Sequence, residues 1–162
     1  MKRSPAMEAS SRPYALGPGE GRPIDLDDFD MTVKASEVET GGLVSVLEAE
    51  EPAGFGPPIH VHHDCAEAFY VLEGEYVMYL EDREVVCPAG SFIFIPQGAR
   101  HGFRVGEVRS RKLNFYFPAS MIGYFDALAA ALGQQGVSDE QLAGIAAEHA
   151  MEIVGPPSER YV

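Results

Sequence analysis

The residues best suited to chemistry are two histidines separated by one residue. His60 and His62 flank Val61. In an extended strand, side chains two residues apart point to the same face, so both imidazoles can bind one ion while Val61 points away. The spacing therefore predicts a strand that presents a pair of metal ligands.

A carboxylate and another histidine are further candidate ligands. Glu67 lies five residues after His62, and this odd separation would place it on the opposite face of a straight strand. The chain must therefore bend between them, and the segment His63-Asp64-Cys65 has the composition of a turn. His101 follows a second turn, Pro96-Gln97-Gly98.

The ligand types restrict the metal. Imidazole nitrogens with one carboxylate oxygen suit Mn, Fe, Co, Ni or Zn better than Ca or Mg. Four protein ligands leave open positions on a metal that prefers about five or six neighbours, and a substrate oxygen, water or dioxygen can bind there. The pattern therefore predicts one divalent transition metal with room for chemistry, without identifying the element.

Two motifs around these residues resemble those of the cupin superfamily. The first runs from Gly54 to Gly74 and the second from Gly90 to His101. Residue type, order and spacing agree at nine positions, which are Gly54, His60, His62, Glu67, Gly74, Gly90, Pro96, Gly98 and His101. The departure is Val105, where the family usually has an Asn that is not a metal ligand. That change concerns local packing more than the site.

This resemblance implies an all-β fold, a jelly-roll barrel of about six to eight strands. It also implies that the metal ligands are His60, His62, Glu67 and His101. Single-domain cupins with this ligand set resemble quercetinase-like dioxygenases. In such a mechanism a substrate hydroxyl oxygen binds the metal, Glu67 accepts its proton as the catalytic residue, and dioxygen attacks the activated ring.

Three functions remain open at this point. The leading hypothesis is a small metal-dependent dioxygenase for an aromatic or polyphenolic molecule, with a substrate pocket formed by Phe69, Met78, Phe103 and Tyr116. A second is a cyclase or isomerase in which the ion acts only as a Lewis acid and Glu67 or a nearby tyrosine moves a proton. The third is a non-catalytic barrel that binds a small molecule.

Short β-type runs separated by turn signals must position these side chains. The runs are rich in aromatic and β-branched residues, and they follow one another at close spacing, as in an all-β sandwich or barrel. They occupy residues 43–47, 68–72, 76–80, 85–86, 91–95 and 113–117.

Both ends of the chain differ from this pattern. Residues 1–30 are rich in Ser, Pro and Gly and predict a flexible arm, either disordered or adding a strand to the barrel or to a neighbour. Helical periodicity over 120–132 ends at Gly133, and the capping box Ser138-Asp139-Glu140-Gln141 opens a second helix through about Ala150. We therefore expect an arm (1–30), a barrel (31–118) and a helical extension (119–162) packed on the barrel.

Three residues outside the ligand set receive simpler interpretations. His63 should face away from His62 and lie in the outer layer or at the rim of the site. His149, which has no partner in the sequence, is expected at the surface. Cys65 is interpreted as a small buried side chain, although its place between two ligands leaves a redox or ligand role open.

The composition restricts partners and location. The formal charge is −13, from 25 acidic and 12 basic side chains, and this excess repels nucleic-acid phosphates and anionic membrane surfaces. No apolar run approaches the roughly 20 residues that span a bilayer, and two cysteines cannot form a disulfide framework. We therefore expect a cytoplasmic homodimer that takes a small organic molecule as substrate and binds neither nucleic acid nor membrane.

Overall fold

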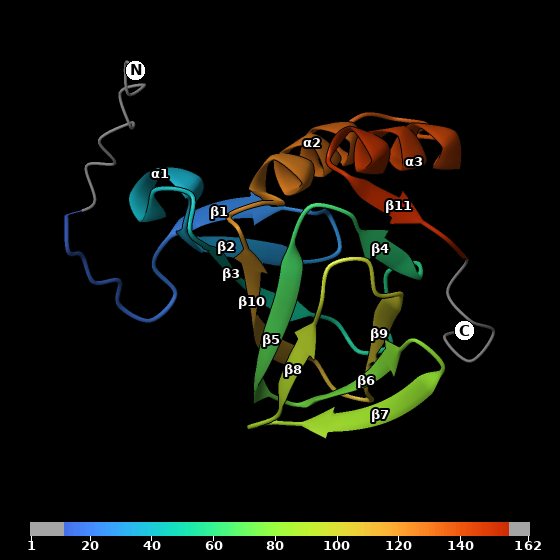
Figure 1. Ribbon diagram of the computed structural model, residues 1–162, viewed down its shortest axis with the longest axis horizontal. Helices are drawn as coiled ribbons and strands as arrows, with labels where there is room; N and C mark the ends of the chain where they lie inside the picture. Colours follow the sequence, from blue (N-terminus) through green and yellow to red (C-terminus); the bar gives the residue numbers. More distant parts are fainter. Residues whose placement is uncertain (1–11, 156–162) are drawn as a thin grey trace, which may run out of the picture.

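The short apolar runs fold into two antiparallel sheets that face each other, as the computed structural model of the chain shows for residues 12–155 (Figure 1). The six-stranded sheet has the order β1-β2-β3-β10-β5-β8. Its strands are β1 (Arg22–Asp25), β2 (Asp30–Ala35), β3 (Ser45–Glu51), β10 (Ser110–Phe117), β5 (Ala66–Glu73) and β8 (Phe92–Ile95).

The five-stranded sheet has the order β11-β4-β9-β6-β7. Its strands are β11 (Met151–Ile153), β4 (His60–His62), β9 (His101–Val105), β6 (Glu75–Leu80) and β7 (Arg83–Pro88). The prediction of an all-β jelly-roll barrel followed by two helices is confirmed, because α2 (Ile122–Leu132) and α3 (Asp139–Glu148) lie together across one end of the barrel (Figure 1). The short helix α1 (Glu37–Thr40) connects β2 to β3.

The N-terminal segment extends the six-stranded sheet. β1 pairs with β2 in register from Arg22↔Val33 to Asp25↔Asp30, so part of the segment expected as an arm adds a strand to the chain's own barrel. Arg22 also forms a bidentate ion pair with Asp126 of α2, at 2.9 and 3.0 Å. Residues 1–11 of the expected arm lie outside the described residues.

The C-terminal segment returns to the barrel as a strand. The predicted capping box is present, since Ser138 Oγ accepts from the Gln141 amide at 3.2 Å and Gln141 Oε1 accepts from the Ser138 amide at 2.9 Å. The helix ends at Glu148, earlier than the predicted limit near Ala150, and Met151 then pairs with His62. In β11, the apolar residues Met151 and Ile153 alternate with the polar Glu152. A pattern of three residues is too short to identify a strand from sequence.

The core is divided between the two ends of the barrel. One cluster lies under the helices and includes Met31, Leu47 and Tyr116. The other lies at the opposite end and includes Phe69, Met78 and Phe103. Polar side chains interrupt the apolar interior between the clusters, and they form the site described below. Among residues 12–155, no helix is long and apolar enough to cross a membrane.

Gly74 and Gly90 lie at strand ends, and they allow the cost of left-handed backbone to be separated from the cost of a steric clash with a neighbouring side chain. Gly74 and Gly90 both adopt left-handed backbone, with φ of 75° and 89°. A Cβ at Gly74 would lie 2.7 Å from the Cβ of Ser110, whose hydroxyl accepts from the Glu75 amide at 3.0 Å, whereas a Cβ at Gly90 would meet nothing within 4 Å.

We predict that Gly74→Ala destabilises the barrel more than Gly90→Ala. Both variants carry left-handed strain of about 1–2 kcal/mol, and only Gly74→Ala adds the cost of overpacking, about 1–3 kcal/mol. The free energy of unfolding, measured by urea denaturation, should therefore fall further for Gly74→Ala. Equal losses in the two variants would contradict the conflict with Ser110.

Candidate metal centre

Three histidines from one sheet meet a carboxylate from the other. His60 and His62 lie on β4, and His101 on β9 is the register partner of His60. Glu67 lies on β5 in the facing sheet. The chain crosses from one sheet to the other between His62 and Glu67, through the segment that the sequence predicted to bend. The four side chains are buried.

Their donor atoms converge on a small volume. One nitrogen or oxygen from each of the four residues lies within 4.8 Å of the others. Glu67 Oε2 is 2.8 Å from His101 Nε2 and 3.1 Å from His62 Nε2. The ring centroids of His60 and His101 are 4.3 Å apart. The four residues singled out by the sequence are therefore brought together.

Backbone carbonyls orient two of the imidazoles. His60 Nδ1 lies 2.7 Å from the Pro58 carbonyl oxygen, and His101 Nδ1 lies 3.0 Å from that of Ala99. A carbonyl oxygen can only accept, so each Nδ1 carries the proton and donates it. His60 Nε2 then presents its lone pair to the centre, which is the arrangement that metal-binding histidines use, and His101 Nε2 faces Glu67 Oε2 at 2.8 Å.

The electrostatics of the cluster keep His60 neutral. Burial, followed by the charge of His101, lowers the pKa of His60 to about 3. Burial alone would raise the pKa of Glu67, but the hydrogen bond with His101 and the close charge interactions with His62 and His101 hold that pKa well below the ordinary range. Burial would also lower the pKa of His101, and Glu67 outweighs it and raises that pKa. The site therefore combines a neutral imidazole with a buried carboxylate.

The donor set fits a divalent transition metal. His62 Nε2 approaches Glu67 closely but has no hydrogen bond of acceptable geometry among the described residues. Both ring nitrogens of His62 are buried without a hydrogen-bond partner in the described part of the chain, and a cation would supply the partner that Nε2 lacks. Three imidazole nitrogens and one carboxylate oxygen match the preferences of Fe, Mn, Co, Ni or Zn. The cluster is therefore a candidate centre for one such ion.

Tyr116 lies beside the carboxylate. It is the register partner of Glu67, and its ring lies 5.8 Å from that of His62. Burial, followed by the negative charge of Glu67 and a hydrogen bond to it, raises the pKa of Tyr116 well above the ordinary range. Its hydroxyl group therefore remains protonated.

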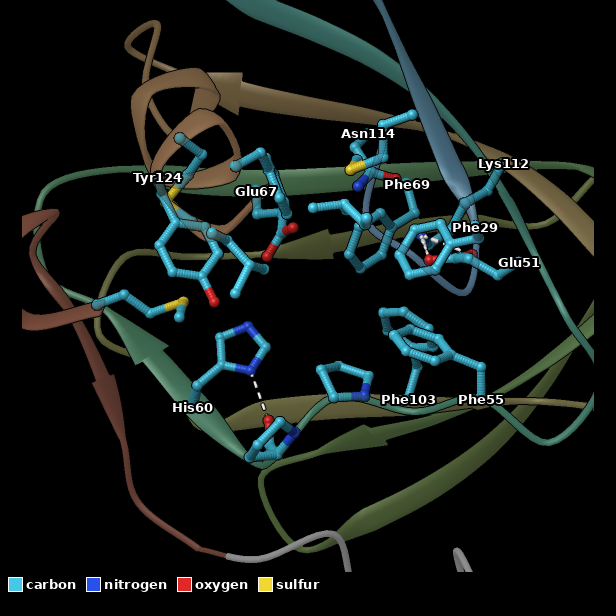
Figure 2. Close-up of a pocket in the computed structure, with 18 of the residues that line it drawn as sticks. Phe29, Glu51, Phe55, His60, Glu67, Phe69, Phe103, Lys112, Asn114 and Tyr124 are labelled. Carbon is cyan, nitrogen blue, oxygen red and sulfur yellow. Dashed lines mark hydrogen bonds and ion pairs between the residues drawn. The ribbon is translucent and has the colours of Figure 1, made fainter. Parts of the chain in front are cut away.

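A cavity of about 290 Å³ opens from the cluster into the barrel. Figure 2 shows His60 and Glu67 with Tyr124 at one end, and Phe29, Phe55 and Phe103 with Lys112 and Glu51 at the other. Most of its wall is aromatic or aliphatic, and α2 contributes Tyr124, Phe125 and Leu128. The helical extension therefore covers the cavity directly.

The residues expected to form the substrate pocket separate into two groups. Phe69, Phe103 and Tyr116 line the cavity. Met78 is fully buried and is not among the lining residues. It is the register partner of Phe103 and packs in the same core cluster, so it supports the wall without contributing to its surface.

Sequence reasoning missed a buried ion pair at the far end of the cavity. Lys112 Nζ lies 2.9 and 3.1 Å from the two carboxylate oxygens of Glu51, and the Tyr76 hydroxyl donates to Glu51 at 2.6 Å. The ammonium also lies 4.5 Å from the ring centroid of Phe103 and 4.9 Å from that of Phe69. Strand alternation places Lys112 on the same face as Asn114 and Tyr116. It indicates the direction of the lysine but not its partner Glu51.

The three residues with simpler interpretations lie outside the ligand group. His63 is exposed and pairs with Glu152 at 2.8 Å, at the rim as expected. His149 caps the end of α3 and is half-buried, with its ring 6.0 Å from that of Tyr124, so it is less exposed than the sequence suggested. Cys65 is buried in the core, and burial raises the pKa of its thiol to about 12.

Comparison with known proteins identifies the class of the barrel. Residues 46–109 match the family model of the cupin domain. The best-aligned region of a solved RmlC-like cupin from Shewanella frigidimarina superposes with a TM-score of 0.58 at 18% identity, covering 67% of this chain and 93% of that one. The matched segment and the superposition together assign the barrel to the cupin fold.

Two curated relatives are similar in sequence. The chain is 28% identical to the quercetin 2,3-dioxygenase of Bacillus subtilis over 116 residues, which are 72% of this chain and 34% of that protein. It is 31% identical to an uncharacterized protein of Methanocaldococcus jannaschii over 75 residues, which are 46% of this chain and 60% of that protein. The chain thus spans about a third of the first relative and 60% of the second.

We predict that His62→Ala abolishes stoichiometric metal binding and that His63→Ala does not. Loss of even an outer partner of a metal ligand weakens affinity about 10- to 100-fold, so loss of a ligand should weaken it further. His63 is the matched control because it is adjacent in sequence but exposed and paired with Glu152. Elemental analysis after dialysis measures the bound metal. Equal metal content in the two variants would show that His62 is not a ligand.

Proposed function

We propose that the chain is a metal-dependent oxygenase acting on an aromatic or polyphenolic small molecule. The observation that carries the proposal is the direct opening of the cluster onto an aromatic-walled cavity of about 290 Å³. A site that serves only to hold an ion does not need such a cavity, and ligand pockets combine mostly apolar walls with a few polar groups. The similarity to a quercetin 2,3-dioxygenase supports this substrate class.

The proposed metal ligands are His60, His62, Glu67 and His101. A divalent transition metal held there would acidify a substrate hydroxyl group and, where redox-active, carry electrons from an organic ring to dioxygen. Glu67 is the proposed catalytic residue, since its carboxylate is ionised and lines the cavity, where it can receive that proton.

The cavity walls perform the remaining steps. The ring centroids of Phe69 and Phe103 are 6.0 Å apart and the two rings are nearly perpendicular. Both residues line the cavity. Such an arrangement can hold a planar ring by edge and face contacts. The apolar surface of α2 closes the same space, so a bound substrate would exclude water from the reacting atoms.

The contact between Tyr116 and Glu67 favours a second candidate function. A protonated tyrosine hydrogen-bonded to an ionised carboxylate can relay a proton, as a cyclase or isomerase with a purely Lewis-acidic ion requires. Oxygen dependence separates the two candidates, because only the oxygenase consumes dioxygen. Turnover that continues unchanged under anaerobic conditions would favour the cyclase or isomerase.

We predict that the Fe-, Mn- or Ni-loaded protein consumes oxygen with a flavonol or catechol, and that Glu67→Gln removes most of this activity. General base catalysis contributes about 100- to 10,000-fold, so kcat should fall at least about 100-fold while substrate still binds. Oxygen uptake and substrate binding are measured with metal in excess, because Glu67 is also a proposed ligand.

The matched control for this experiment is Glu152→Gln. Glu152 is an exposed carboxylate that pairs with His63 outside the cavity, so its removal should leave oxygen uptake unchanged. Substrate binding without any turnover in the wild-type protein would instead identify a non-catalytic binder. Absence of oxygen uptake with all three metals and the whole substrate panel would refute the oxygenase.

We also propose that the protein forms a homodimer through an aromatic patch on the outer face of the six-stranded sheet. The patch comprises Tyr70, Phe92, Phe94, Phe115 and Phe117. Tyr70 pairs with Phe92, and Ala68 lies between Phe94 and Phe115 in register, so the rings share one face. Phe92 is 66% and Phe94 is 56% exposed. Exposed apolar patches of this kind favour association, and a second copy can bury the same patch by twofold symmetry.

Phe94→Glu should convert the proposed dimer to a monomer. A charge within a self-complementary interface is buried against the apolar surface of the second copy, which is unfavourable. Light scattering coupled to gel filtration measures the mass, with Val38→Glu as the control because Val38 is exposed on α1 outside the patch. A monomeric wild-type protein at micromolar concentration would contradict the proposal.

A further inference from the structure

The inward face of β10 is polar along its length. Lys112, Asn114 and Tyr116 alternate with the less buried Leu113 and Phe115, which reverses the usual pattern of apolar residues inside and polar residues outside. All three polar side chains line the cavity. Tyr116 is the register partner of Glu67, and Figure 2 shows Asn114 and then Lys112 further from that carboxylate, towards Phe29 and Phe103. Polar side chains in such positions need partners.

Two of the three already have them. Lys112 donates to both oxygens of Glu51, and its ammonium group also lies near aromatic rings. Glu51 in turn accepts from Tyr76. The Tyr116 hydroxyl faces Glu67. The ion pair and the tyrosine are therefore satisfied by the protein itself.

Asn114 is the exception. Its side chain is only 4% exposed, and Nδ2 makes one long contact of 3.5 Å to the Tyr116 hydroxyl. Oδ1 is buried and has no hydrogen-bond partner among residues 12–155. An amide oxygen that lines a cavity without a protein partner can accept a hydrogen bond from a ligand. Figure 2 places Asn114 between Glu67 and Lys112.

We propose that Asn114 is a specificity-determining residue that accepts a hydrogen bond from a second hydroxyl group of the substrate. This inference rests on the proposed function, since it concerns the substrate of the same cavity. A site built around an unsatisfied polar group discriminates strongly against an analogue that lacks the matching group, because that polar atom then stays buried without a partner.

The strand register indicates where the second hydroxyl lies. Tyr116 pairs with Glu67 and Asn114 pairs with Phe69. Two residues of a strand advance by about 7 Å, so Asn114 lies roughly that far along the wall from the carboxylate. Adjacent hydroxyl groups of a catechol are much closer together. The substrate therefore carries its second hydroxyl on the far edge of the ring system or on a second ring.

The experiment compares two proteins against paired ligands. The wild-type protein and Asn114→Leu, which keeps the branched side chain of four heavy atoms and removes both polar atoms, are loaded with zinc so that redox turnover does not consume the ligand. Equilibrium dialysis measures the Kd of 3-hydroxyflavone and of derivatives that each carry one additional hydroxyl group. Elemental analysis confirms equal zinc content in the two proteins.

We expect at least one derivative to bind the wild-type protein about three- to tenfold more tightly than the parent compound, which is the usual contribution of one neutral hydrogen bond. Asn114→Leu should lose this preference and keep its affinity for the parent compound. Leu113→Met, on the opposite face of the same strand, should retain the preference.

The other outcomes separate this inference from the proposed function. If Asn114→Leu keeps the same preference, or if no derivative is preferred by the wild-type protein, Asn114 does not select the substrate, while binding of the parent compound leaves the proposed function standing. If the zinc-loaded wild-type protein binds neither the parent compound nor any derivative, the substrate class fails and this inference fails with it.

Discussion

The structure depends on the meeting of one carboxylate with three imidazoles between two sheets. Glu67 reaches across the barrel from β5, and the histidines face it from β4 and β9. Burying four polar side chains in this way is unfavourable unless each has a partner. Glu67 supplies a partner for His101, and backbone carbonyls hold His60 and His101. His62 has no hydrogen-bond partner at either ring nitrogen among the described residues, and a cation shared by all four side chains would supply one.

The reversed polarity of β10 follows from the same requirement. A cavity that holds an organic molecule beside a charged centre needs polar groups on its wall, and β10 supplies them from alternate positions. The residues between them must then point outward, and Leu113, Phe115 and Phe117 do so. One strand thus accounts for both the polar lining of the cavity and part of the aromatic patch on the outer face. A sheet that carries apolar groups on both faces is common where one face packs against another protein surface.

Strand alternation and turn composition were sufficient to predict that His60 and His62 share one face of a strand, that the chain bends before Glu67 and that two helices follow the barrel, because each depends on residues close in sequence. The arm was predicted to be either disordered or strand-forming, and β1 realises the second alternative by pairing with the next strand, β2. β11 was missed, since it is held by pairing with β4, which is distant in sequence. The pairing of Lys112 with Glu51 joins residues 61 positions apart, and nothing local in the sequence indicates it. Met78 was predicted to line the pocket, but it packs behind the residues that do. The sequence can indicate that a side chain points into the barrel, but it does not indicate whether that side chain reaches the cavity surface.

The position of the cluster within the cavity bears on whether an ion there would serve structure or chemistry. A structural ion is usually enclosed by its ligands on all sides. Here the ligands come from β4, β5 and β9, and the remaining side is the cavity, which His60, His62 and Glu67 all line. The helix α2 closes that side with apolar residues, although it contributes no ligand. An ion held by these residues would therefore have its free coordination positions directed at a covered, largely apolar space, where an organic ring can be held out of water while its oxygen meets the centre.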